Sequence, residues 1–90
     1  MFKVVGNSMA PTLENGRYII AEKFSQLFFG FQIGDVAVIK LADGQKIIKR
    51  ITAKMGDIYF VEGDNKDHST DSRHFGLVGK NDIIGKVIKL

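Results

Sequence analysis

The sequence predicts a mainly β fold, a small curled antiparallel sheet or partly open β-barrel with little helix. Short runs rich in β-branched and aromatic residues recur along the chain, and turn-forming residues separate them. No long segment has the apolar period of an amphipathic helix. The predicted strands are residues 18–21, 36–39, 45–52, 58–61 and 83–88.

The turns between these strands are predicted from glycine. Asn15-Gly16, Asp43-Gly44 and Gly56-Asp57 each contain a residue that adopts positive φ without steric cost, which is typical of hairpin and bulge turns. We therefore expect one hairpin around Gly44 and a second around Gly56. Single helical turns are expected at residues 9–13 and 22–27.

Length and composition indicate one domain, residues 1–90, of an ordinary globular class. The net charge of +3 is scattered, so we expect a solvated surface and no nucleic-acid partner. The chain has no cysteine, which excludes disulfides, and His68 and His74 lack further ligand spacing, so no metal or cofactor is expected. No apolar run is long enough to span a membrane, which predicts a soluble cytoplasmic protein if Met1 is the native start. A membrane-associated location is the alternative.

Lys49 lies in the strand segment Ile47-Ile48-Lys49-Arg50-Ile51. Strand alternation places Ile47, Lys49 and Ile51 on one face. A lysine between two isoleucines is expected to be desolvated, which lowers its pKa from about 10.4 and makes the neutral amine available as a base. The alternative is a lysine whose charged end extends from a half-buried strand to solvent.

Ser8 lies in a turn bounded by Gly6 and Pro11. Glycine permits close backbone approach and proline restricts φ, so the turn is constrained. A serine held in this way can present its hydroxyl as a nucleophile while its own N–H serves as an oxyanion donor. The alternative is a helix N-cap, in which Ser8 or Asn7 caps the turn at residues 9–13.

Residues 63–76 are rich in Gly, Asp, Asn and Ser, which predicts a loop. Ser69 is a candidate to hydrogen-bond a nearby amine. Charged residues are expected to brace the loop, with a pair two positions apart at its centre. These residues are Asp71 and Arg73, with Arg50 and Asp64 as further candidates. A solvated polar loop without a role is the alternative.

Four groups of residues resemble, in order, the sequence motifs of the type I signal peptidase family. They are SMAPTL at 8–13, GDV at 34–36, KR at 49–50 with GD at 56–57, and GDN at 63–65 through STDSR at 69–73 with Gly76. Together they cover nearly the whole chain. The last group resembles signal peptidases better than the repressor and mutagenesis-protein autoproteases that share their Ser/Lys dyad. The resemblance implies a serine endopeptidase on the β-rich catalytic core of that family.

Carried over to matching positions, the resemblance implies Ser8 as the nucleophile and Lys49 as the general base. Ser69 then orients the lysine amine. The residues implied to brace the catalytic loop are Asp71, Arg73, Arg50 and Asp64. The residues expected to contact substrate are Gly6, Met9 and Pro11. Some members of the family carry a serine at the position of Gly6, which completes the oxyanion hole, so here the hole depends on backbone donors or water.

The implied substrate is a precursor protein with small residues at the cleavage site, from which an N-terminal leader or propeptide is removed. The family's membrane anchor and its inserted second domain have no counterpart in this sequence. We therefore expect the chain to be most similar to the small soluble members that trim the precursor of nickel-type superoxide dismutase. The alternatives are a membrane-associated leader peptidase or a fragment of one, and a catalytically silent β-rich binding module.

A group of large apolar residues falls within residues 24–31. Its aromatic members are Phe24, Phe28, Phe29 and Phe31. They are expected either to cover the core or to form an exposed apolar lip that touches a membrane or a partner. In the second case the residues of peripheral membrane contact are Phe28, Phe29 and Phe31.

Overall fold

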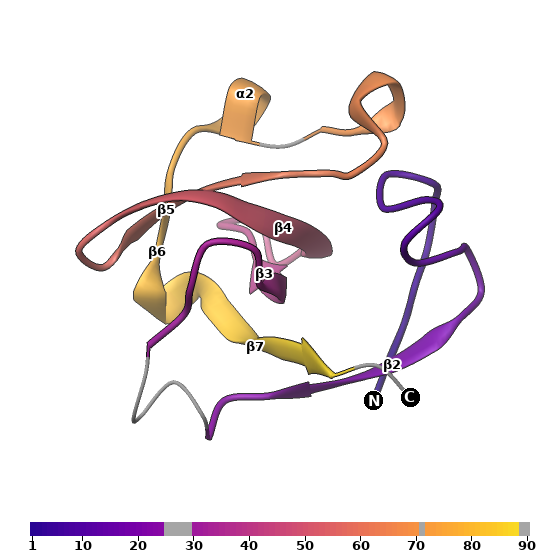
Figure 1. Ribbon diagram of the computed structural model, residues 1–90, viewed down its shortest axis with the longest axis horizontal. Helices are drawn as coiled ribbons and strands as arrows, with labels where there is room; N and C mark the ends of the chain where they lie inside the picture. Colours follow the sequence, from indigo (N-terminus) through magenta and orange to yellow (C-terminus); the bar gives the residue numbers. More distant parts are fainter. Residues whose placement is uncertain (25–29, 71, 89–90) are drawn as a thin grey trace.

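One antiparallel sheet of seven strands, in the order β1-β2-β7-β3-β4-β5-β6, makes up most of the protein (Figure 1). The computed structural model describes residues 1–24, 30–70 and 72–88. The strands are β1 (Phe2–Lys3), β2 (Tyr18–Glu22), β3 (Val36–Lys40), β4 (Lys46–Met55), β5 (Ile58–Glu62), β6 (Val78–Gly79) and β7 (Ile83–Ile88). The helical elements are η1 (Lys66–His68), α2 (Ser72–Phe75) and η2 (Lys80–Asp82). The sheet does not close on itself, and the predicted mainly β fold with little helix is confirmed.

All five predicted strands are present, and the two that sequence patterns missed, β1 and β6, have only two residues each. The hairpins β3–β4 and β4–β5 form as expected, with φ of +88° at Gly44 and +58° at Gly56. The turn predicted at residues 9–13 is also present, because the Leu13 N–H donates to the Met9 carbonyl at 2.9 Å. The turn predicted at 22–27 is wrong at its start, where Glu22 is in β2, and residues 25–27 lie outside the described residues.

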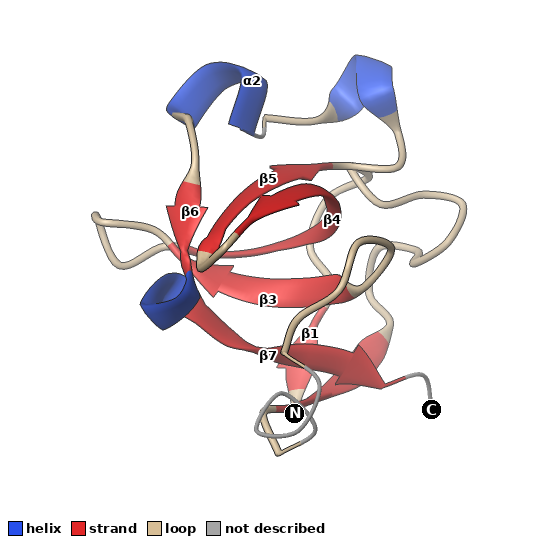
Figure 2. Ribbon diagram, turned by 60° about the vertical axis from the view of Figure 1, so that its left-hand side comes forward, coloured by secondary structure: helices blue, strands red, loops and turns tan. Residues whose placement is uncertain are grey.

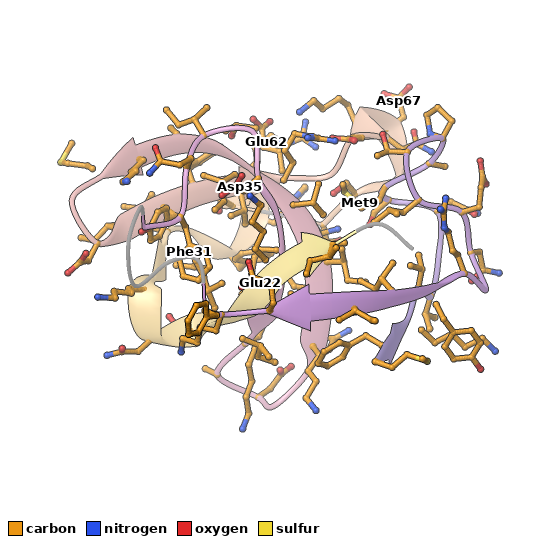
Figure 3. All side chains as sticks on the ribbon, turned by 60° about the horizontal axis from the view of Figure 1, so that its bottom comes forward. Met9, Glu22, Phe31, Asp35, Glu62 and Asp67 are labelled. Atoms are coloured by element: carbon orange, nitrogen blue, oxygen red, sulfur yellow. The ribbon has the colours of Figure 1, made fainter. Side chains whose placement is uncertain are left out.

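Both faces of the central strand β3 are buried. Ala37 and Ile39 belong to one hydrophobic cluster, whereas Val38 between them belongs to a second. The two clusters are built around different large side chains, Phe31 in the first and Met9 in the second, and Figure 3 shows these two residues well apart. Strands β4 to β6 contribute to the first cluster and strands β1 and β2 to the second. The two ends of the curled sheet therefore cover opposite faces of β3.

Strand β4 alternates as the sequence predicts. Ile47 and Ile51 pack in the first cluster, and Ile48 packs against the second. Lys49 therefore projects from the same face as two core isoleucines, and only 4% of it is exposed. The low exposure of Lys49 confirms the prediction that this lysine is removed from solvent.

The expectation that Phe31 forms part of an exposed lip is wrong. Phe31 is 1% exposed and meets Tyr59 edge to face, with ring centroids 6.0 Å apart and an interplanar angle of 83°. Burying the large apolar surface of the Phe31 ring in the core stabilises the fold more than an exposed contact of the same ring would. Phe24 is 70% exposed, and Phe28 and Phe29 lie outside the described residues.

The segment that carries η1 and α2 lies beside β5, above the sheet in Figures 1 and 2. β6 pairs with only the first two residues of β5, so the rest of this edge needs other partners. The buried hydroxyl of Ser72, at the start of α2, accepts a hydrogen bond of 2.9 Å from the Val61 N–H. The loop predicted at 63–76 thus contains two short helices that cover a sheet edge. Within the described residues, the structure contains no helix with the length and apolarity that a membrane span requires.

Replacement of Phe31 by Ala is expected to lower the free energy of unfolding by about 3–5 kcal/mol, because it leaves a cavity against Tyr59 in the first cluster. Urea denaturation followed by circular dichroism measures this change. The matched control is Phe24→Ala, which is expected to change stability by about 0.5 kcal/mol or less because Phe24 is exposed. Equal losses in the two variants would contradict the assignment of Phe31 to the core.

Candidate active site

Ser8 is half-buried in a turn between β1 and β2 that is tied to the loop after β5. The Asn65 N–H donates to the Ser8 carbonyl at 2.8 Å, and the Asn65 side-chain amide donates to the Asn7 carbonyl at 3.0 Å. The Ala10–Pro11 peptide within this turn is cis. One asparagine of the later loop therefore fixes the backbone on both sides of the Asn7–Ser8 bond. Sequence reasoning assigned no role to Asn65.

The amine of Lys49 is held by Ser69. Lys49 Nζ donates to Ser69 Oγ at 3.1 Å, and the same oxygen accepts the Gly63 N–H at 3.1 Å. An oxygen that accepts two hydrogen bonds is held in place, so it defines the position of the amine. The sequence-based expectation that Ser69 hydrogen-bonds an amine agrees with this geometry.

Gly63 lies between the two halves of the site. A Cβ built on Gly63 would lie 2.5 Å from the Ser8 carbonyl oxygen and would also collide with the Ser69 side chain. The Ser8 turn and the Ser69 segment approach each other this closely only because position 63 has no side chain. Sequence analysis placed Gly63 in a family motif without predicting this contact.

Ser8 and Lys49 line the same cleft, which has a volume of about 360 Å³. One wall comes from β1 and the residues after it, and the other comes from the first half of β4. Apolar residues of both walls are among those that line the cleft. The lining residues other than Ser8 and Lys49 are Lys3, Val4, Val5, Met9, Gln45, Lys46, Ile47, Ile48 and Thr70. Two segments far apart in the sequence thus contribute Ser8 and Lys49 to one concave surface.

Arg50, the neighbour of Lys49, points to the other face of β4 and makes a bidentate ion pair with Asp64. Its Nε and Nη2 reach the two Asp64 carboxylate oxygens, each at 2.8 Å, while Nη1 donates to the Gly34 carbonyl at 2.7 Å. The Thr12 hydroxyl donates to the same carboxylate at 2.6 Å. This network links β4, the Ser8 turn and the loop after β5. Thr12, which sequence reasoning did not single out, is the member that belongs to the Ser8 turn.

The Arg50 hydrogen bonds are the main cause that lowers the pKa of Asp64 below its ordinary value, and the Thr12 hydroxyl adds to this effect. Burial of the carboxylate acts in the opposite direction, but the hydrogen bonds outweigh it. The pKa of Arg50 is raised in return. The pair therefore stays ionised over the whole physiological range of pH.

Arg73 braces the far side of the loop. It donates to the Lys66 carbonyl at 3.1 Å and lies 3.8 Å from the Glu62 carboxylate at the end of β5. Glu62 also pairs with Lys66 at 3.3 Å. The predicted partner of Arg73, Asp71, lies outside the described residues. Arg73 thus connects two parts of the loop to the sheet, through a glutamate that sequence reasoning did not name.

The three predicted substrate contacts have different surroundings. Met9 is buried, lines the cleft and accepts the Asp64 N–H with its sulfur at 3.4 Å. Gly6 is exposed with φ of +84°, and its N–H is donated to the Asn15 side chain at 2.9 Å. Pro11 is also exposed, and neither Gly6 nor Pro11 is among the cleft-lining residues. Of the three, the described structure brings only Met9 to the cleft.

Replacement of Asp64 by Asn is expected to lower the free energy of unfolding by about 1–2 kcal/mol near pH 7, because Arg50 and Thr12 lose a charged acceptor. The contribution of a carboxylate with a lowered folded pKa is complete above about pH 4 and is lost as the pH falls through the folded value. The difference between the two proteins should therefore shrink in acid. Denaturation midpoints measured from neutral to strongly acidic pH test this, with exposed Asp67→Asn as the control. A difference independent of pH would contradict the prediction.

The signal peptidase (peptidase S26) family model matches residues 1–58 and 57–89. The two matched segments meet at the turn between β4 and β5.

Individual relatives agree with the family match. Mitochondrial inner membrane protease subunit 1 of Mus musculus is 32% identical over 104 residues, which covers 91% of this chain and 63% of that protein. Mitochondrial ATP-independent inner membrane protease subunit 1a of Arabidopsis thaliana is 34% identical over 110 residues, with 94% and 66% covered. Signal peptidase I V of Bacillus subtilis (strain 168) is 25% identical over 137 residues, with 96% and 82% covered. The chain spans less than two thirds of the length of the mouse relative. The family model matches nearly all of this chain. The protein therefore belongs to the signal peptidase family, peptidase S26.

Proposed function

We propose that the protein is a serine endopeptidase in which Ser8 is the nucleophile and Lys49 the general base. The observation that carries this proposal is the shared cleft, which Ser8 and the buried Lys49 both line. Burial disfavours the ammonium form of a lysine and so favours the neutral amine that a base requires. Ser69, the hydrogen-bond acceptor of this amine, is a neutral group that orients it without adding a negative charge.

The proposed reaction begins when the neutral Lys49 amine removes the Ser8 hydroxyl proton and Ser8 Oγ attacks the scissile carbonyl. The Ser8 N–H donates to the developing oxyanion. The Lys49 ammonium then protonates the leaving amine, and an acyl-enzyme remains on Ser8. Water, deprotonated by Lys49, attacks this ester, and the Lys49 ammonium returns the proton to Ser8 Oγ as the second product leaves. The cycle returns both residues to their starting states.

The surrounding residues have positioning roles in this proposal. Ser69 orients the amine, and Asn65 holds the backbone of the nucleophile. The ion pair of Arg50 with Asp64 fixes β4 against the loop, and Arg73 fixes the loop against β5. We assign Asp71 to the same bracing group from its place in the family motif. Met9 forms part of the substrate surface, whereas Gly6 and Pro11 shape the turn.

Among the residues that the structure describes, the Ser8 hydroxyl makes no hydrogen bond. A helix N-cap would use this hydroxyl to accept from the backbone N–H groups that follow it. The alternative of Ser8 as a cap therefore lacks its defining contact, and the hydroxyl is available for attack on a substrate.

Replacement of Ser8 by Ala, or of Lys49 by Ala, is expected to lower kcat/KM by about a thousandfold or more, because each removes one member of the dyad. Cleavage of a precursor, followed by N-terminal sequencing of the product, measures the effect. Lys54→Ala, on the same strand but outside the cleft, is expected to cleave at the wild-type rate. Wild-type rates in the Ser8 and Lys49 variants would rule out the dyad.

For the substrate, we propose an N-terminal leader or propeptide with small residues at the cleavage site. A nickel superoxide dismutase precursor is the specific candidate that sequence resemblance supports. Co-expression with this precursor is expected to yield a trimmed product whose new N-terminus follows the leader, and the Ser8→Ala variant should leave the precursor intact. An untrimmed precursor in the presence of wild-type enzyme would exclude this substrate.

The alternative substrate is a leader peptide of a membrane-inserted precursor. The names of the relatives, signal peptidase and inner membrane protease, favour it. Phe24, one of the aromatic residues of the predicted apolar lip, is 70% exposed. Binding to liposomes that is lost in Phe24→Ala would support this alternative.

A further inference from the structure

The peptide bond between Asn7 and Ser8 is fixed at its oxygen. The Asn7 carbonyl accepts two hydrogen bonds, one from the Ala10 N–H at 3.1 Å and one from the Asn65 side-chain amide at 3.0 Å. The first donor belongs to the same turn and moves with it. The second belongs to the loop after β5, so it fixes the direction of this carbonyl relative to the rest of the site.

The direction of the Ser8 N–H follows from that of the Asn7 carbonyl, because both belong to one planar peptide. The Asn7–Ser8 peptide is trans, so its C=O and its N–H point in opposite directions. Within the described part of the chain, the Ser8 N–H donates to no acceptor. The proposed oxyanion donor is thus free to bind a ligand, and its direction is set at the opposite end of its own peptide bond.

Asn65 also fixes the peptide on the other side of Ser8. Its backbone N–H donates to the Ser8 carbonyl at 2.8 Å. One residue therefore holds both of the peptide planes that flank the Ser8 Cα, and these planes determine the two backbone dihedral angles of Ser8. The side chain and the backbone of Asn65 have separate partners, so a substitution at this position removes only the bond to the Asn7 carbonyl.

A second asparagine fixes the chain that leads into the turn. Asn15 Oδ1 accepts the Gly6 N–H at 2.9 Å, and Gly6 has φ of +84°. Glycine has wider conformational freedom than any other residue, and this hydrogen bond restricts it two residues before Ser8. The bond also occupies the Gly6 N–H, which leaves the Ser8 N–H as the donor that faces no partner.

We propose that Asn65 and Asn15 are positioning residues for the oxyanion hole, whose side chains hold the backbone before Ser8 so that the Ser8 N–H is oriented before substrate binds. This inference rests on the proposed endopeptidase function. Each asparagine acts through the backbone and not on the reacting atoms. A donor that is already oriented needs no reorganisation when negative charge develops, so the two side chains stabilise the transition state rather than bind the substrate.

Variants of Asn65 test the larger of the two effects. Asn65→Ala removes the amide, and Asn65→Asp keeps its shape but has no donor when ionised. Each is expected to lower kcat about tenfold to a hundredfold for a peptide with alanine at the cleavage site, because loss of a whole oxyanion donor costs about a hundredfold to a thousandfold. KM should change by about twofold or less. In Asn65→Ala the midpoint of the pH–rate profile should not move, since Lys49 keeps its surroundings.

Asn15→Ala tests the second asparagine. It is expected to lower kcat by about threefold to tenfold, again with little change in KM, because its hydrogen bond to Gly6 is exposed and acts at a greater distance from Ser8. The matched control is Asn81→Ala. Asn81 is an exposed asparagine of η2, and its replacement should leave kcat and KM unchanged.

A transition-state analogue separates orientation from loss of structure. When a peptide aldehyde binds, Ser8 Oγ forms a bond to the aldehyde carbon, Lys49 takes the hydroxyl proton, and the negative charge passes to the aldehyde oxygen. The matched peptide alcohol forms no such bond. In Asn65→Ala the affinity for the aldehyde should fall by the same factor as kcat/KM, whereas the affinity for the alcohol should stay within about twofold of wild type. A variant that had lost its fold would lose both.

A wild-type kcat in the Asn65 variants would overturn the proposal, as would equal losses of aldehyde and alcohol affinity. A loss confined to KM would also overturn it, because the asparagine would then act on substrate binding. A wild-type kcat in Asn15→Ala would overturn the role of Asn15. The proposed function is tested separately with Ser8→Ala. Cleavage by that variant would reject the dyad, whereas cleavage that requires Ser8 but is indifferent to Asn65 would reject only the orienting role.

Discussion

The contact of Gly63 with the Ser8 turn and with Ser69 is the constraint on which the rest of the site depends. The Ser8 turn is near the N-terminus, and Ser69 follows β5, so they meet only by close backbone approach. A Cβ at position 63 would lie 2.5 Å from the Ser8 carbonyl oxygen. The hydrogen bonds of Asn65 to the Ser8 turn and of Ser69 to Lys49 both require this approach. One absent side chain therefore sets the geometry of both proposed catalytic groups.

Strand β4 presents two cations to different surroundings. Lys49 is buried on the face of the first cluster, where its described partner is a neutral hydroxyl. Arg50 projects to the opposite face and pairs with a carboxylate that stays ionised. An arginine suits the second position because its guanidinium remains charged and binds both oxygens of a carboxylate. Adjacent residues of like charge thus meet different surroundings because a strand alternates its faces.

The sequence predicted much of the fold because strand signals are local. The five longer strands, the hairpins at Gly44 and Gly56, and the burial of Lys49 all follow from alternation and turn chemistry within a few residues. The errors arose where local signals were absent or ambiguous. β1 and β6 are too short to show a pattern. The aromatic residues near Phe31 fitted either a core or an exposed lip, and only packing against Tyr59 decides for the core.

The sequence by itself determined the family, the strand that carries Lys49, and Ser8 as the candidate nucleophile, because these depend on motifs and on periodicity along one segment. Only the tertiary structure decided which residues meet. The placement of Thr12 against Asp64, of Ser72 under the edge of β5, and of Lys46 opposite Lys40 depends on strand pairing and on the path of the loops. Contacts between residues distant in the chain are set by how the whole sheet buries its apolar faces, and no local pattern in the sequence records that.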